Sequence, residues 1–172
     1  MSNFIIDPYR FVEAETCQPV TNADGVTGVG GGGGNITDVG FKILSGSPFI
    51  GMTPTEIKFK LAKGGDTANP TGTGTMKVYN ESDSVIATST NTVSASGLPT
   101  SPTFSQETFT FSGISALAEN DTVAIQGWST ADQDRVDVYI CSPSEYATQY
   151  VRFLQSGSWI QRTARDCDVC MK

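Results

Sequence analysis

Residues 53–80 read TPTEIKFKLAKGGDTANPTGTGTMKVYN and contain two alternations of apolar and polar side chains. In the first, single polar residues separate Ile57, Phe59 and Leu61; in the second, Lys77 separates Met76 from Val78. Successive side chains of a β-strand point to opposite faces, so each segment has one apolar and one polar face. The stretch therefore predicts two half-buried strands joined by a glycine-containing connection.

The same alternation continues on both sides of this stretch and predicts a β-sandwich. Further short strands are expected at 39–44, 84–89, 107–112, 122–128, 135–141 and 147–154. Residues 89–105 are rich in Ser, Thr, Pro and Gly, and a connection of this length suggests a crossover between two sheets. The predicted fold is all-β, a jelly-roll or Greek-key β-sandwich of about eight strands.

Composition divides the chain into three parts. Residues 1–35 are expected to form an N-terminal arm and a glycine-rich linker, since residues 30–34 are all glycine. Residues 36–155 would form the sandwich and residues 156–172 a C-terminal tail. Candidate contacts with neighbouring subunits are Phe4, Ile6, Phe11, Trp159 and Ile160. An alternative makes the N-terminal segment a first strand that caps the sandwich.

The charge of the chain is concentrated in one region. The net charge is −7, and the interval between Lys77 and Arg135 contains seven acids and no base. Phosphate binding requires clustered Lys and Arg, so we expect no direct nucleic-acid binding and no attraction to an anionic membrane. No apolar run approaches the roughly 20 residues of a membrane span, and the N-terminus does not read as a signal peptide. We therefore expect either synthesis without secretion or removal of a signal.

Catalysis has little support in the sequence. The chain has no histidine, which is the commonest general base and transition-metal ligand. It contains neither a GxSxG motif nor a carboxylate pair in a recognisable context. We expect a protein that is not an enzyme and has no cofactor, with Ca²⁺ as a candidate ligand.

The four cysteines suggest a disulfide or a metal site. Cys167 and Cys170 form a CxxC pair and are candidates for a disulfide, while Cys17 and Cys141 lie far from them in the sequence. A redox-active CxxC normally begins a helix, and none is predicted here. Zinc binding and two disulfides remain open, because pairing cannot be deduced from sequence alone.

Two further sets of side chains are candidate binding residues. Exposed aromatic rings beside polar groups can stack on sugars, and the candidates are Trp128, Tyr139, Tyr79 and Trp159. The alternation places Trp128 on the face opposite Val123 and Ile125, although a tryptophan there would equally serve a subunit contact. The closely spaced carboxylates of Asp132, Asp134 and Asp137 could bind Ca²⁺, although their spacing is not that of an EF-hand. A solvated acidic loop is the plainer interpretation.

Several of these segments together resemble a known group of proteins. The motifs are PTGT at 70–73, VYN at 78–80, VIAT at 85–88 and FTF at 109–111. They are similar to β-sandwich modules of virus and phage structural proteins and of archaeal and bacterial surface proteins. FIIDPYRFV at 4–12 also looks like the start of many phage structural proteins. The likeness covers about residues 55–127 and implies a fold, without catalytic residues to carry over.

These observations lead to one main functional expectation and two alternatives. We expect a non-enzymatic structural protein of a virion or similar multi-copy surface assembly, as an outer shell, decoration or tail. Its location would be the virion or the extracellular surface, with copies of itself as partners. The alternatives are a carbohydrate-binding or adhesive module that recognises a surface glycan, and a secreted filament subunit that assembles by strand exchange.

Overall fold

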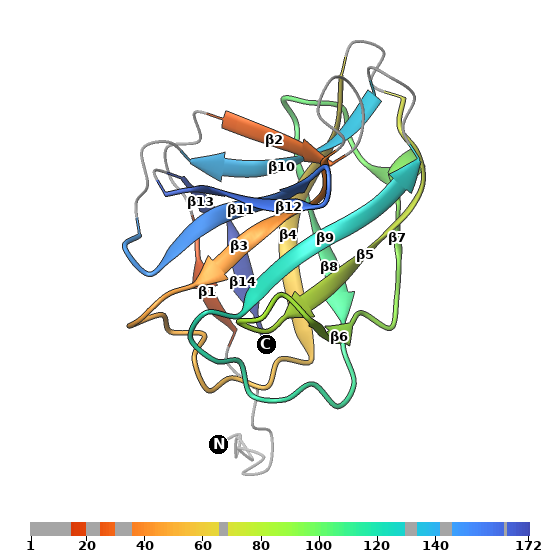
Figure 1. The fold of residues 1–172 in the computed structure, drawn as a ribbon. Coiled ribbons are helices and arrows are strands. Elements are labelled where there is room, and N and C mark those ends of the chain that lie inside the picture. The colour runs from red at the N-terminus through yellow and green to blue at the C-terminus, as the bar shows by residue number, and fades with distance from the viewer. Residues whose placement is uncertain are drawn as a thin grey trace, which may run out of the picture.

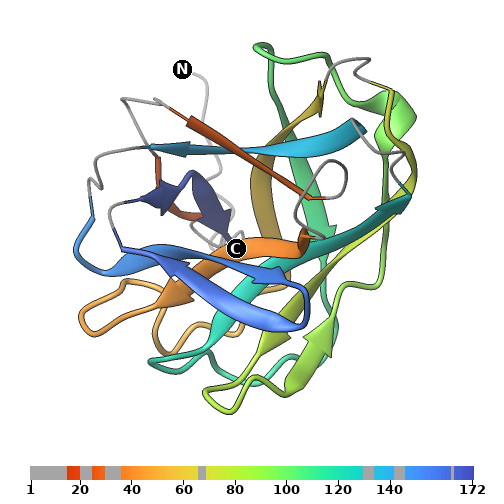
Figure 2. The ribbon, with the colours of Figure 1, turned by 45° about the horizontal axis from the view of Figure 1, so that its top comes forward.

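The computed structural model describes residues 15–19, 25–29, 36–65, 69–129, 134–141, 146–163 and 165–172. Its described part is all-β apart from one short 3₁₀ turn, η1 (Ala95–Gly97), and consists of two antiparallel sheets packed face to face (Figure 1). Figure 2 shows the two layers more nearly from one end, with β2 and β10 in one layer and β3 and β11 in the other. The expectation of a β-sandwich is confirmed.

Each sheet combines strands that are distant in the sequence. Sheet I contains β1 (Thr16–Gln18), β2 (Gly25–Val29), β4 (Glu56–Gly65), β8 (Ser105–Thr110), β10 (Asp134–Cys141), β13 (Asp166–Cys167) and β14 (Val169–Met171). Sheet II contains β3 (Ile36–Ile43), β5 (Thr71–Tyr79), β6 (Val85–Thr88), β7 (Val93–Ser94), β9 (Thr122–Ser129), β11 (Gln149–Gln155) and β12 (Ser158–Arg162).

The alternation in residues 53–80 determines which faces meet. Ile57, Phe59 and Leu61 of β4 and Met76 and Val78 of β5 are all fully buried. The two strands belong to different sheets, so the chain passes from sheet I to sheet II between Gly65 and Thr71, and the described glycines of this stretch lie within the strands themselves. Each strand therefore supplies one inner face to the common core.

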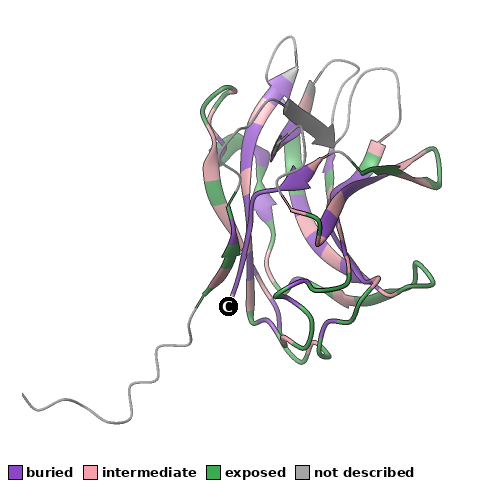
Figure 3. Cartoon of the chain, turned by 90° about the vertical axis from the view of Figure 1, so that its left-hand side faces the viewer, coloured by how far each residue is buried: buried purple, intermediate pink, exposed green. Residues whose placement is uncertain are grey.

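Aromatic side chains join the two inner faces. Phe41 of β3 contacts Phe59 of β4 with ring centroids 6.0 Å apart, and it contacts Phe49 at 5.9 Å. Buried residues (purple in Figure 3) line the strands, whereas exposed residues concentrate on the connections and outer edges. Burial of each large apolar side chain contributes roughly 1.5–3 kcal/mol, so this shared core supplies much of the stability.

The long connection at 89–105 passes between the sheets, as the sequence predicts. It contains β7 of sheet II and leads directly into β8 of sheet I. Thr90 donates a backbone hydrogen bond to Thr110 O, and the Asn91 side chain bonds the backbone of β8 at Thr108 and Thr110. One edge of the sandwich is thereby closed by local hydrogen bonds.

The predicted C-terminal tail is wrong as a separate part, because β12, β13 and β14 of the sandwich lie within residues 156–172. β12 pairs with β11 in sheet II, β13 pairs with β10, and β14 lies between β1 and β4 in sheet I. β1 and β2 are also strands of sheet I, so these two segments of the predicted arm and linker belong to the sandwich. Phe4, Ile6 and Phe11 lie outside the described residues.

Candidate functional site

Trp128 is not an exposed stacking platform, and this prediction is wrong. The residue is only 7% exposed, belongs to the apolar core, and donates from Nε1 to the carbonyl oxygen of Val93 at 3.1 Å. The alternation fails because Gly127 and Trp128 have positive φ values of 107° and 55°. The pairing of β5 with β9 also shifts register between Thr71 and Gly74, and such a bulge re-aims side chains.

Two other aromatic candidates, Tyr79 and Trp159, lie together on the outer face of sheet II. Their rings meet edge to face with centroids 5.2 Å apart, and the Arg152 guanidinium lies 4.5 Å from the Trp159 centroid. Tyr79 donates a hydrogen bond to the carboxylate of Asp38. Burial, followed by this hydrogen bond, raises the pKa of the Tyr79 phenol, so the phenol remains a donor at neutral pH. We call Asp38, Tyr79, Asp83, Thr122, Arg152 and Trp159 the outer cluster of sheet II.

Arg152 is the central cation of this outer cluster. Its side chain donates from Nη1 to Asp83 at 2.8 Å and to Thr122 Oγ1 at 2.7 Å, while its Nε has no protein hydrogen-bond partner. Arg152 is 5% exposed, so the carboxylate of Asp83 balances a charge that has lost most of its water. The arrangement ties the β11–β12 hairpin to the turn after β5. Its residue types, aromatic, acidic and guanidinium, can also bind a polar ligand, although Tyr79 is only 6% exposed.

Tyr139 lies on the outer face of sheet I, apart from the other three aromatic candidates. Phe104 packs against its ring with centroids 4.9 Å apart, and Lys60 Nζ lies 5.1 Å from the ring centroid. Lys60 also forms a 2.8 Å ion pair with Asp168, which is almost completely buried. The four predicted sugar-binding aromatics therefore do not form one surface. Only Tyr79 and Trp159 are brought together.

Of the predicted calcium set, the structure describes one side chain, that of Asp137. Asp132 lies outside the described residues, and Asp134 begins β10 without a described side chain. Asp137 is buried and accepts a 2.6 Å hydrogen bond from Arg135 Nε. Burial raises the pKa of Asp137, and Arg135 offsets part of this rise. Its carboxylate therefore already has a cationic partner within its own strand.

Cys170 is bonded to Cys17 and not to Cys167, which corrects the CxxC prediction. Cys17 and Cys170 are direct cross-strand partners in β1 and β14, with Cα atoms 4.1 Å apart. This register brings the two sulfurs together, whereas Cys167 belongs to β13 and pairs with Ile140 of β10. The disulfide joins positions 153 residues apart in the sequence.

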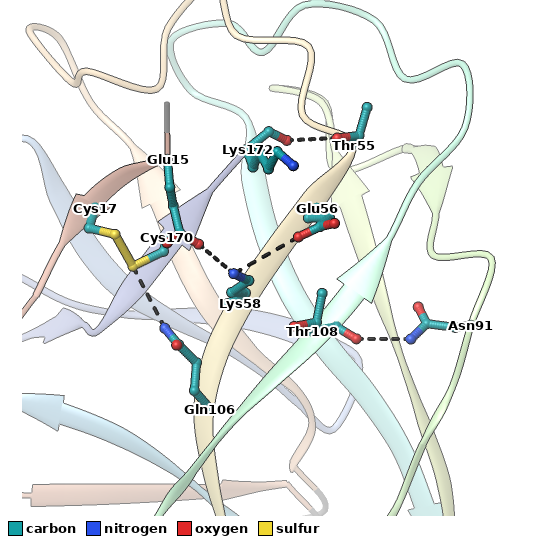
Figure 4. A network of polar contacts seen from close by, with 10 residues as sticks. All are labelled: Glu15, Cys17, Thr55, Glu56, Lys58, Asn91, Gln106, Thr108, Cys170 and Lys172. Atoms are coloured by element: carbon teal, nitrogen blue, oxygen red, sulfur yellow. Dashed lines mark hydrogen bonds and ion pairs between the residues drawn. A yellow bond between two sulfur atoms is a disulfide. The ribbon is translucent and has the colours of Figure 1, made fainter. Parts of the chain in front are cut away.

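Polar side chains surround this disulfide on the outer face of sheet I (Figure 4). A Glu15 carboxylate oxygen lies within 4.8 Å of both sulfurs, and Lys58 Nζ forms a 2.8 Å ion pair with that carboxylate. The hydrogen bond that Lys58 donates to Glu15 raises the pKa of Lys58. Gln106 Nε2 donates to Cys170 Sγ at 3.7 Å. We call Glu15, Cys17, Lys58, Gln106 and Cys170 the disulfide patch.

The sequence contains no strong signal for two of these features. Arg152 alternates with the buried Val151 and Phe153, a pattern that normally indicates a solvent-facing cation. The pairing of Cys17 with Cys170 depends on strands at the two ends of the chain, and spacing alone cannot reveal it.

Comparisons with known proteins add no family to this description. No protein-family model matches the chain, and no curated protein matches it significantly. Within the described ranges, no helix is long and apolar enough to cross a membrane.

Proposed function

We propose that this chain is a non-enzymatic structural protein, one subunit of a virion or similar multi-copy surface assembly. The proposal places it on the outside of the assembly, as a shell, decoration or tail component. Three features support it: the two-sheet body, the excess of acids between Lys77 and Arg135, and the resemblance of residues 55–127 to modules of such proteins. The acidic excess disfavours a lining in contact with packaged nucleic acid.

The observation that carries the proposal is the exposed edge of sheet II at β6. In the described part of the chain, β6 pairs on one side with β5 and is the last strand of its sheet. Val85 and Ile86 are adjacent on it and are 48% and 43% exposed. Edge strands of soluble proteins are usually blunted by lysine or proline, and β6 has neither. An edge of this kind fits contact with another protein chain.

The finer topology is part of the same proposal. We infer a jelly-roll or Greek-key arrangement from the crossover at 89–105 and from sheets whose neighbours are distant in sequence. A jelly-roll body would give a rigid building block for a symmetric assembly.

The incorporation of β12–β14 into the sheets changes which segments can join subunits. Trp159 packs on Tyr79 and Arg152, and Ile160 packs against the core. Both residues therefore already serve the fold of their own chain. We propose that subunit contacts involve residues 1–14, with Phe4, Ile6 and Phe11, and the β6 edge.

Sedimentation velocity and electron microscopy across a concentration series test this function. We expect the full chain to assemble, and expect deletion of residues 1–14 or the double substitution Val85→Thr, Ile86→Thr to weaken assembly at least tenfold. Threonine retains the β-branch, so β6 itself should persist. Ile50→Thr is the matched control, because Ile50 is 41% exposed in a loop outside both sheets. A monodisperse monomer at every concentration, for all four proteins, would reject the proposal.

The outer cluster of sheet II supports a second candidate, a carbohydrate-binding or adhesive module. It combines the partly exposed Trp159 with Tyr79, Arg152 and two carboxylates. The matched test is a glycan array with the wild type and Trp159→Ala, with unfolding by urea as the folding control. Binding that is lost in Trp159→Ala supports this candidate, and the absence of any glycan signal removes it. The alternative of a filament subunit that assembles by strand exchange predicts end-to-end polymers in the electron micrographs.

A further inference from the structure

The two cysteines of the Cys17–Cys170 disulfide differ in their exposure to solvent. Cys17 is exposed on β1, whereas Cys170 on β14 is only 6% exposed. A disulfide is cleaved when a thiolate attacks one sulfur and the other sulfur leaves as a thiolate. Access therefore favours attack on Cys17 Sγ, with Cys170 as the leaving group.

The neighbours of the disulfide favour the same direction. The Gln106 amide donates to Cys170 Sγ at 3.7 Å, so a donor is already in place for charge that develops on this sulfur. Lys58 lies 2.8 Å from the Glu15 carboxylate, which is within 4.8 Å of both sulfurs. The positive charge of Lys58 offsets the negative charge of Glu15, which would otherwise repel both the attacking thiolate and the thiolate that leaves.

We propose that Cys17–Cys170 is a thiol-exchange site, at which a small external thiol attacks Cys17 Sγ and expels Cys170 as the thiolate. In the first step, the attacking thiol loses its proton, its sulfur bonds to Cys17, and the Cys17–Cys170 bond breaks. The Cys170 thiolate takes up a proton, so one disulfide replaces another without net oxidation. A second molecule of the thiol then releases Cys17 as a thiol and leaves as the symmetrical disulfide of the reagent.

Cleavage would remove the covalent cross-link between β1 and β14. Strand β1 has three residues, and the described noncovalent contacts of residues 15–19 include pairing with β14, the Glu15–Lys58 ion pair, the bond from Gln18 Nε2 to Thr148 and the bond from the Tyr146 hydroxyl to Pro19 O. A strand this short is held weakly without its cross-link. The exchange site would thus control how firmly residues 15–18 are attached to the body, whether or not the chain assembles with copies of itself.

The test uses the full folded chain and reduced glutathione as the thiol. After reaction in native buffer, acid quenching and alkylation, trypsin separates Cys17 (after Arg10) from Cys170 (after Arg165) for mass spectrometry. We expect glutathione on Cys17 and the alkyl group on Cys170, with adduct on Cys17 at least tenfold above adduct on Cys170. Equal or reversed labelling overturns the direction. If the disulfide is cleaved only in urea, the proposed exchange site of the folded protein is rejected.

A matched pair of variants tests the role of Gln106. Gln106→Leu retains the size of the side chain and removes the donor to Cys170, so we expect native-state cleavage to slow severalfold. Thr108→Val on the same strand is the control and should react at the wild-type rate. Urea unfolding of the oxidised proteins checks that both variants fold equally well. An unchanged rate in Gln106→Leu rejects stabilisation of the leaving thiolate.

Hydrogen exchange tests the consequence for β1. After cleavage, the amides of residues 16–18 should exchange at least tenfold faster, while those of β9 in sheet II keep their protection. Uniform acceleration would indicate global destabilisation, and unchanged protection of β1 would show that the disulfide does not control its attachment. Either result contradicts the inferred release.

Discussion

Gly74 shows how one residue position depends on another strand. A Cβ atom at Gly74 would lie 2.3 Å from Trp128 Cζ2, because the indole packs directly over the β5 backbone. Trp128 is fixed by its bond to Val93 O and by its place in the core, so it cannot easily move away. We expect Gly74→Ala to lower the free energy of unfolding by about 2–3 kcal/mol, as overpacking does. Urea unfolding followed by tryptophan fluorescence measures this, with Gly97→Ala, where a Cβ meets open space, as the control.

Asp121 provides a pH-dependent prediction at the residue scale. Its carboxylate is buried, which raises its pKa, while a hydrogen bond from Ala118 N lowers it by a smaller amount. A carboxyl with a folded-state pKa above its unfolded value binds its proton more tightly in the folded state. Its ionisation therefore costs stability above that pKa, and the cost disappears as the pH falls below the unfolded value.

Asp121→Asn should consequently stabilise the protein at neutral pH, since the asparagine can still accept the bond from Ala118 and carries no charge. The advantage should shrink as the pH falls towards about 4, where the wild-type carboxyl is protonated. Urea midpoints across this range measure the difference, with the substitution of the exposed neighbour Glu119→Gln as the control. A gain that grows on acidification would contradict the assigned cause.

At the element scale, Arg152 links the β11–β12 hairpin to the turn after β5. The two members of its ion pair differ in burial, with side chains 6% and 39% exposed for Arg152 and Asp83. Asp83→Asn should cost about 2 kcal/mol or more, because it leaves a buried cation without its counter-charge. Asparagine also tolerates the positive φ of 59° at this position.

Arg152→Met should cost less than Asp83→Asn, because methionine fills the space under Trp159 and Asp83 returns to solvent. The double variant should match Arg152→Met alone. Urea unfolding of all four proteins completes the cycle. An Arg152→Met cost larger than that of Asp83→Asn would show that the cation itself, through Thr122 and Trp159, dominates the stability of this contact.

The local alternation of apolar and polar residues predicts strands and their buried faces well, but it does not predict where the alternation breaks. The alternation of Ile57, Phe59 and Leu61 gives the correct buried face because period-two burial is a local property. The face of Trp128 is missed because one left-handed pair, Gly127 and Trp128, reverses the alternation, and the sign of φ at a tryptophan is not visible in its neighbours. β12 is missed because SWIQR owes its place to pairing with β11, and polar outer strands have weak sequence signals.

At the scale of the whole molecule, the pairing of strands that are distant in the chain is also not predicted by the sequence. β14 lies between β1 and β4, which unites residues from both ends of the chain, and only such pairing brings Cys17 opposite Cys170. Hydrogen bonds from the Thr55 and Glu56 amides to Lys172 O further fix the C-terminal residue to the start of β4. Strands from both ends of the chain thus lie side by side in sheet I. Substitutions at residues 167–172 should therefore lower the stability of the whole domain.

The disulfide should stabilise the whole molecule mainly through the unfolded chain. For a closed loop of 153 residues, the chain-entropy model gives about 5 kcal/mol as an upper value, and typical disulfides contribute about 2–4 kcal/mol. Cys17→Ser, Cys170→Ser should therefore lose about 2–4 kcal/mol. Its urea m-value should rise, because an unfolded chain without the cross-link exposes more surface.

Deletion of residues 1–18 separates this entropic contribution from the contacts of β1. It removes both the cross-link and β1, whereas the double serine variant retains the strand. If the entropy of the unfolded chain dominates, the two proteins should be almost equally stable. A deletion that costs much more than the double variant would show that β1 contacts such as Glu15–Lys58 and Gln18–Thr148 carry the stability, and that the cross-link mainly fixes the position of the N-terminal segment.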